Sequence, residues 1–176
     1  LCRNTAPIIS LAFQLIRQGI GCRVEGRDIG QGLIKLATKW KTVKTLAGLE
    51  SALEKWADRQ IARAQAKNAA AVAQTIADQR ETLQVVIDRC REQKRDGIDH
   101  VVAAIQSIFE DNVTGMLVLS TIHKSKGREW DTVFWLDRDG TLPSKYARQK
   151  WQLQQEDNLC YVAATRAKQC LIEVVI

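Results

Sequence analysis

The sequence of 176 residues has little proline and no long apolar run. With two prolines in all, long uninterrupted helices are possible. No stretch of about 18 apolar residues occurs, so no membrane-spanning helix is expected. The cysteines are odd in number and form no CxxC pair, which argues against a disulfide framework and a zinc site and predicts no metal site. We expect each to be a small apolar core residue in a reducing, cytoplasmic compartment: Cys2, Cys22, Cys90, Cys160 and Cys170.

Two features expected of a complete enzyme are also missing. No GxxxxGK[ST] stretch occurs, which is the loop that cradles nucleotide phosphates in many ATPases. The chain has no starting methionine and no signal-peptide pattern, and it opens on what reads as the end of a strand. We therefore expect it to be a piece cut from a longer protein.

The charge balance is basic, with a formal net charge of +6. Such a balance permits binding to nucleic acid. It does not by itself establish such binding, because basic proteins without anionic ligands are common.

The two ends of the sequence predict an α/β fold with a parallel sheet, because strands alternate with amphipathic helices. Asn4 or Thr5 can cap a first helix, and Gly19 is placed to end it. A last helix is expected over 155–168, in QEDNLCYVAATRAK. Strand segments are expected at Leu1–Arg3, Cys22–Val24, Met116–Ser120, Thr132–Leu136 and Cys170–Val175. The strands Met116–Ser120 and Thr132–Leu136 are apolar enough to be covered on both faces.

The middle of the chain, from residue 30 to residue 109, shows no strand signal and no proline. Its apolar residues recur every three or four positions, which predicts helices. We interpret residues 30–109 as an all-helical insertion between two parts of one sheet domain, 1–29 and 110–176. The simplest role for it is packing; a contact with duplex DNA or a partner is the alternative.

A cluster of charge lies between two apolar strands in STIHKSKGREWDTVF. Because loops at the carboxyl ends of parallel strands converge on one edge, His123, Lys124 and Lys126 are expected at a ligand-binding edge. Gly127 allows a sharp turn there, and cations with free N–H groups suit a phosphate. A solvated loop is an equally good interpretation. Arg166 can fork onto a phosphate, but spacing alone favours an ion pair with a carboxylate such as Glu156 or Asp157.

Three segments, in this order, resemble the UvrD/Rep/PcrA family of superfamily-one DNA helicases. LCRNTAPIISLAFQLIRQGIGCRVEG is similar to motif IVa, STIHKSKGREWDTVF to motif V and QEDNLCYVAATRAK to motif VI. Together they cover about 60 residues. The resemblance implies a second RecA-like domain with a parallel sheet, flanking helices and the helical insertion.

For the nucleotide, the resemblance implies roles for three residues. Arg166 matches the motif VI arginine that reaches the γ-phosphate of ATP and acts in catalysis. Glu129 matches the motif V glutamate that touches the ribose, and Gly127 belongs to the Lys-Gly step that shapes the loop. Mg²⁺ would be held mainly by the N-terminal RecA-like half, which this sequence lacks.

For the DNA strand, the resemblance implies contacts from Thr121 and His123, with Lys124 beside them. Arg3 and Asn4 match the motif IVa pair, whose contact with DNA is the weaker expectation. Departures from the family pattern include Arg128, Trp130, Asp157 and Asn158, none of which removes a residue expected to act in the chemistry.

The expected function is therefore the C-terminal half of an ATP-dependent DNA helicase, inactive as an ATPase alone. Its partners would be single-stranded DNA, duplex/single-strand junctions and the N-terminal RecA-like domain of the same parent chain. We expect a bacterial or phage-infected cell as its setting, with DNA repair among its pathways, and no membrane association. The alternatives are a non-catalytic nucleic-acid-binding or adaptor module of the same fold, or a helicase–nuclease component of RecB type.

Overall fold

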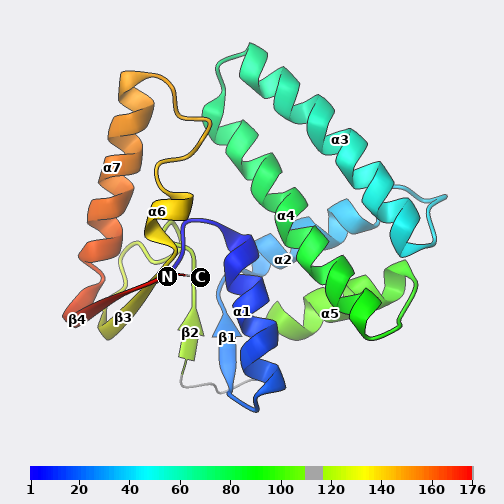
Figure 1. The fold of residues 1–176 in the computed structure, drawn as a ribbon, viewed down its shortest axis with the longest axis horizontal. Coiled ribbons are helices and arrows are strands. Elements are labelled where there is room, and N and C mark those ends of the chain that lie inside the picture. Colours follow the sequence, from blue (N-terminus) through cyan, green and yellow to red (C-terminus); the bar gives the residue numbers. More distant parts are fainter. Residues whose placement is uncertain (110–116, 176) are drawn as a thin grey trace.

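The computed structural model describes residues 1–109 and 117–175. Residues 110–116, which include Met116 of an expected strand, lie outside the described part. Helices dominate the first two thirds of the chain, where there is one short strand after the first helix. The other strands lie in the last third of the chain (Figure 1). The elements are α1 (Thr5–Arg17), β1 (Cys22–Val24), α2 (Arg27–Ala37), α3 (Leu46–Ala66), α4 (Ala70–Glu92), α5 (Ile98–Phe109), β2 (Leu117–Leu119), β3 (Trp130–Leu136), α6 (Arg138–Thr141), α7 (Lys150–Ala164) and β4 (Ala167–Val174).

The strands form two parallel pairs, β1 with β2 and β3 with β4. The first two residues of the chain join the pairs. The Cys2 N–H donates to the Ser120 carbonyl at 3.3 Å, and the Cys2 carbonyl accepts from the Ile122 N–H at 2.9 Å. On the other side, the Leu1 carbonyl accepts from the Leu136 N–H at 2.7 Å. An α/β fold with parallel strands is confirmed, as two short sheets linked by a strand end rather than as a complete RecA-like sheet.

The ends of several elements differ from the sequence prediction. The final strand begins at Ala167 rather than Cys170, and the last helix begins at Lys150 and stops at Ala164. Arg166 therefore follows the helix instead of lying within it. A short helix, α6, occupies part of the stretch expected to be a loop. Asn4 is the N-cap residue of α1, but its side chain makes no capping bond; Asp78 of α4 caps this helix instead.

The prediction that β3 is covered on both faces is wrong. Val133 and Trp135 are buried, whereas Thr132 and Phe134 are exposed, and 46% of Phe134 is accessible. Alternate side chains of a strand point to opposite faces of a sheet. The apolar run in the sequence therefore places side chains on both faces of β3, of which one is buried and the other is open to solvent.

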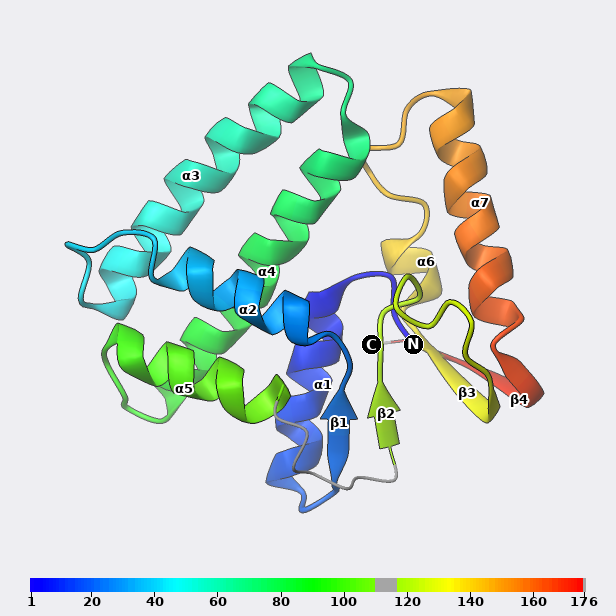
Figure 2. The ribbon, with the colours of Figure 1, turned by 180° about the vertical axis from the view of Figure 1, so that it is seen from behind.

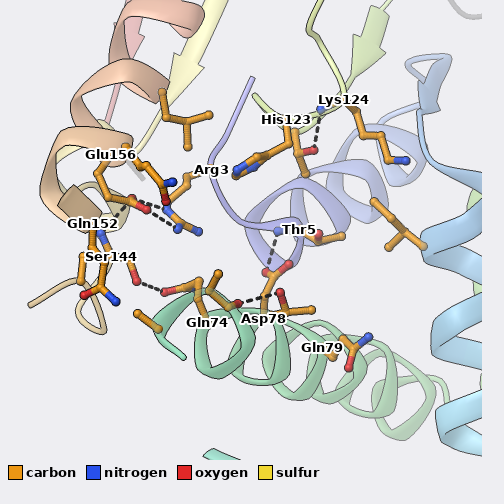
Figure 3. Close-up of a pocket in the computed structure, with 18 of the residues that line it drawn as sticks. Arg3, Thr5, Gln74, Asp78, Gln79, His123, Lys124, Ser144, Gln152 and Glu156 are labelled. Carbon is orange, nitrogen blue, oxygen red and sulfur yellow. Dashed lines mark hydrogen bonds and ion pairs between the residues drawn. The ribbon is translucent and has the colours of Figure 1, made fainter. Parts of the chain in front are cut away.

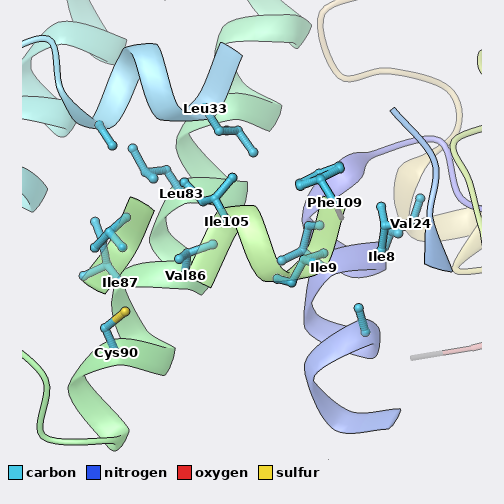
Figure 4. Close-up of a cluster of buried hydrophobic side chains, with 14 of the residues drawn as sticks. Ile8, Ile9, Val24, Leu33, Leu83, Val86, Ile87, Cys90, Ile105 and Phe109 are labelled. Atoms are coloured by element: carbon cyan, nitrogen blue, oxygen red, sulfur yellow. The ribbon is translucent and has the colours of Figure 1, made fainter. Parts of the chain in front are cut away.

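The helical stripes expected from residue 30 to residue 109 are confirmed. α3 and α4 lie side by side, and α2 and α5 pack across them near α1 (Figures 1 and 2). Their apolar side chains meet those of α1 and β1 in one core (Figure 4). This core includes Leu33 of α2, Val86 of α4, Ile105 of α5, Ile9 of α1 and Val24 of β1. The helical segment is thus held against the sheet by a shared apolar core. Burial of apolar surface stabilises the folded state by about 25 cal/mol for each Å² removed from water.

A second, smaller core holds α7 against the sheet. Trp135 of β3 packs there with Leu159 and Ala163 of α7, together with Ile122 and Leu142. Because Leu159 and Ala163 are four residues apart, they present one face of α7 to the strand. This packing sets where the chain leaves α7, two residues before Arg166.

The cysteines follow the prediction in part. Cys2, Cys22 and Cys90 are buried, and Cys160 is half-buried, but Cys170 is exposed on β4. Within the described residues, no helix is long and apolar enough to cross a membrane. In the same part of the chain, no group of three or more His, Cys, Asp or Glu side chains could hold a metal ion.

Candidate nucleotide and nucleic-acid site

The charged segment between β2 and β3 reaches two edges of the sheet. Thr121, His123 and Lys124 follow β2 and lie at the carboxyl edge of the sheet. Glu129 precedes β3, which is parallel, so it lies at the amino end of that strand. Gly127 lies on the path between the two edges and has a φ of +78°, a conformation that glycine adopts without strain. The loop therefore serves two edges, not one.

Arg166 meets the loop at the amino edge. Its carbonyl accepts a bond from the Trp130 N–H at 2.9 Å, next to Glu129. Its guanidinium donates to the carbonyls of Arg128, at 3.0 Å, and Val162, at 2.9 Å, and to the Thr165 hydroxyl at 2.8 Å. These bonds use three of the five N–H groups of a guanidinium.

The expected ion pair of Arg166 is not present. Among residues 1–109 and 117–175, no carboxylate lies within ion-pair distance of its guanidinium, and Glu156 pairs with Arg3 instead. Arg166 is half-buried and Glu129 is exposed. A cation with free donors and an accessible carboxylate thus stand together at one edge of β3 and β4.

A cavity of about 440 Å³ opens at the other edge of the sheet. Four of the expected DNA-contacting residues line it: Arg3, Thr121, His123 and Lys124. Asn4 does not line it but lies beside it, where its side-chain oxygen Oδ1 accepts bonds from the Arg3 guanidinium at 3.3 Å and the Gln74 amide at 3.2 Å. Figure 3 shows the lining side chains arriving from the strand edge, from α4 and from α7.

Arg3 is held in a buried ion pair with Glu156 of α7. Two nitrogens of the guanidinium donate to the two carboxylate oxygens at 2.7 and 2.8 Å. The side chains are 8% and 12% exposed. Burial alone would raise the pKa of Glu156, but the bonds and charge of Arg3, with the Ser144 N–H at 3.0 Å, lower it. The carboxylate therefore stays ionised near neutral pH.

Lys124 is also paired. Its ammonium donates to both carboxylate oxygens of Asp28 at 2.8 and 3.0 Å. This bond lowers the pKa of Asp28, with the charge of Lys124 adding to it against a small opposing effect of burial. The pair is exposed, so it is worth about 1 kcal/mol or less and can open.

His123 stands between these pairs. Burial lowers its pKa, and the positive charges of Arg3 and Lys126 lower it further, while Glu156 opposes them. The imidazole is therefore neutral near pH 7, with one nitrogen that donates and one that accepts.

Sequence reasoning missed the contribution of α4. Gln74 bonds the Ser144 hydroxyl at 2.6 Å, and Asp78 accepts from the Thr5 N–H at 2.6 Å. Burial raises the pKa of Asp78, although the bonds from Thr5 and Ala6 work against this. The available signal was slight: two polar residues four apart on the apolar stripe of a helix. The helical segment, for which packing was the simplest expected role, forms a wall of the cavity.

Comparison with known proteins places the chain in a family. Residues 27–175 match the family model of the UvrD-like helicase C-terminal domain. The chain is also 36% identical over 81 residues to the Bacillus subtilis protein named "Putative ATP-dependent DNA helicase YjcD". That match covers 42% of this chain and 10% of the relative, so the chain spans about a tenth of the relative's length. The match to the family model covers most of the chain, which therefore belongs to the family of UvrD-like helicase C-terminal domains.

Proposed function

We propose that this chain is the C-terminal motor half of an ATP-dependent DNA helicase. One observation carries the proposal: the two helicase-like segments meet, because Arg166 bonds the backbone of the loop that holds Glu129. The same loop presents Thr121 and His123 at the opposite edge. The loop would then reach both a nucleotide edge and a DNA edge. This arrangement suits a motor, because a movement of the loop at the nucleotide edge can shift the residues at the DNA edge.

ATP fits the residues at the first edge. Arg166 retains unused N–H donors, and charge-assisted bonds from guanidinium to phosphate are strong and directional. Glu129, accessible beside it, can accept bonds from ribose hydroxyls. When bound, ATP supplies the free energy of its hydrolysis. Arg166 would stabilise negative charge on the phosphoryl group, a role typically worth about 10³- to 10⁵-fold in rate.

The remaining parts of the ATP site would come from elsewhere in the protein. The phosphate loop and the Mg²⁺ ligands belong to an N-terminal RecA-like domain in this proposal, and the chain alone would not hydrolyse ATP. Residues 1–29 and 110–176 would form the second RecA-like unit and residues 30–109 its insertion. Single-stranded DNA and duplex/single-strand junctions would be the substrates, met at the cavity edge.

The test is kinetic and uses the full-length protein. We expect Arg166→Ala to lower the ATPase kcat at saturating single-stranded DNA by about 10³-fold or more. The dissociation constant for DNA should stay within about twofold, because Arg166 lies at the other edge. Lys168→Ala is the matched control: it removes an exposed cation two residues away and should leave kcat unchanged.

Two results would contradict the proposal. Retained turnover in Arg166→Ala would remove the arginine-finger role. Absence of any ATPase activity in the full-length protein, with DNA binding intact, would favour a non-catalytic nucleic-acid-binding module of the same fold.

A further inference from the structure

The turn from β1 into α2 holds the charged segment between β2 and β3 at two places. β1 leads directly into α2 beside β2 (Figure 2). The turn carries two carboxylates, Glu25 and Asp28, three positions apart. Asp28 pairs with the Lys124 ammonium, and Glu25 pairs with the Arg128 guanidinium. The first helix of the insertion is therefore tied to the charged segment both at the carboxyl edge and close to the start of β3.

Glu25 is fixed to the sheet by its backbone. Its N–H donates to the Leu119 carbonyl of β2 at 2.8 Å. Its side chain is 10% exposed. Within the described residues, one carboxylate oxygen, Oε1, accepts bonds from Arg128 and, at 3.4 Å, from Arg23, and the other, Oε2, is buried without a partner. Because a bond between charged groups is strong where water is scarce, this enclosed carboxylate gives Arg128 a firm point of attachment.

Arg128 joins this point of attachment to Arg166. The Arg128 N–H donates to the Ser125 carbonyl at 3.0 Å, and its carbonyl accepts from Nη1 of Arg166 at 3.0 Å. Two residues later, the Trp130 N–H donates to the Arg166 carbonyl at 2.9 Å. A shift of the Arg128 backbone would therefore move the partner of the Arg166 guanidinium.

The ion pair of Glu25 with Arg128 contributes little to the stability of the fold. The Arg128 side chain is 53% exposed, and ion pairs open to solvent stabilise proteins only slightly. If Arg128 were lost, Arg23 would remain beside the carboxylate as a counter-charge. The loss of this pair should therefore change the position of the loop more than the stability of the protein.

We propose that Glu25 is a positioning residue for Arg166. Its ion pair with Arg128 fixes the loop backbone that holds the Arg166 guanidinium, and so directs the unused N–H groups of that guanidinium toward a bound phosphoryl group. Because Glu25 lies two residues before α2, the pair also links the helical insertion to the nucleotide edge. This inference rests on the proposed function, because it assigns how that arginine is placed for ATP hydrolysis.

The experiment measures the ATPase activity of the full-length protein at saturating single-stranded DNA. We expect Arg128→Ala to lower kcat by about 10- to 100-fold, since a misplaced catalytic group can cost about 10²-fold. The KM for ATP should change by less than about threefold, because the interaction that is lost acts in the transition state. Glu25→Ala should have the same effect. Arg128→Lys should recover most of kcat, because an ammonium can make the single bond to Oε1.

Two further measurements separate positioning from a general structural role. Arg23→Ala is the matched control: it removes the other cation on Glu25 and should leave kcat within about twofold. In a protein that already carries Arg166→Ala, Arg128→Ala should lower kcat no further, because residues that act through one group are not additive. A general loosening of the fold would lower kcat again in that background. The exposed Arg128 side chain keeps the test valid if Glu25→Ala does not fold.

The failures are distinguishable. A kcat in Arg128→Ala equal to that of the unchanged protein, with kcat lost in Arg166→Ala, would overturn the positioning role and leave the arginine finger standing. The same loss from Arg128→Ala with and without Arg166, or no recovery in Arg128→Lys, would also overturn it. An unchanged kcat in Arg166→Ala would instead overturn the proposed function, and the positioning role with it.

Discussion

Removing Arg3 should destabilise the fold far more than removing an arginine from an exposed ion pair. Its guanidinium forks onto Glu156, and both side chains are nearly buried, at 8% and 12% exposure. Without Arg3, Glu156 retains the Ser144 N–H bond but no counter-charge. Breaking one partner out of a buried pair costs about 3–5 kcal/mol. We therefore expect Arg3→Ala to lower the free energy of unfolding by about 3–5 kcal/mol.

The assay is urea unfolding followed by circular dichroism. With a slope of about 2 kcal/mol per molar urea, the midpoint should fall by about 2 M. Replacing both partners by apolar residues, Arg3→Met with Glu156→Leu, should cost much less than the two single changes together, because no uncompensated charge remains. Arg17→Ala is the control: its pair with Glu92 spans 3.2 Å, but both side chains are 60% exposed, so the loss should be about 1 kcal/mol or less. A loss below about 1 kcal/mol in Arg3→Ala, or strict additivity in the double change, would refute the reasoning.

Three further predictions concern stability and use the same unfolding assay. The pKa of Glu156 is lowered in the folded state, so its ionised carboxylate adds to the free energy of unfolding above the unfolded pKa of about 4.3. This stabilisation should be lost as pH falls through the lower folded pKa, and Glu156→Gln should make the free energy of unfolding less dependent on pH in that range. Gly30→Ala should cost about 1–3 kcal/mol, because a Cβ there would come within 2.8 Å of the Phe109 ring, whereas Gly32→Ala on the same helix meets nothing within 4 Å and should stabilise by about 0.5–1 kcal/mol; equal effects would contradict the packing. Thr45→Ala should cost about 1 kcal/mol by removing the cap of α3, where the Thr45 hydroxyl accepts from the Gly48 N–H, and Thr45→Ser should restore it.

The helices were predictable because their information is local. An apolar residue every three or four positions specifies one buried face, and such a stripe on α4, running from Leu83 to Cys90, is buried as expected. Gly19 ends α1 as predicted: it has a φ of +74°, and the Ile20 N–H returns to the Leu15 carbonyl. These signals depend on neighbours within about six residues, which the sequence displays directly.

The open face of β3 was not predictable in the same way. Thr132 to Leu136 reads as a continuous apolar run, typical of a strand covered on both faces, yet Phe134 is exposed. Which face of β3 is covered by a helix depends on elements that lie elsewhere in the chain, such as α7. The same limit applies to Cys170, which the residue type alone placed in the core.

The sequence by itself determined the family segments, the parallel α/β character and the helical middle, because motif order and periodicity are properties of the linear chain. Only the tertiary structure decided the partners of the charged residues: Arg3 pairs with Glu156 across 153 positions, and Lys124 with Asp28 across 96. It also divided one charged loop between two edges, since a parallel strand must start at the edge opposite to where its neighbour ends. Charge and spacing indicate which groups can bind, whereas folding decides which of them remain available to a ligand.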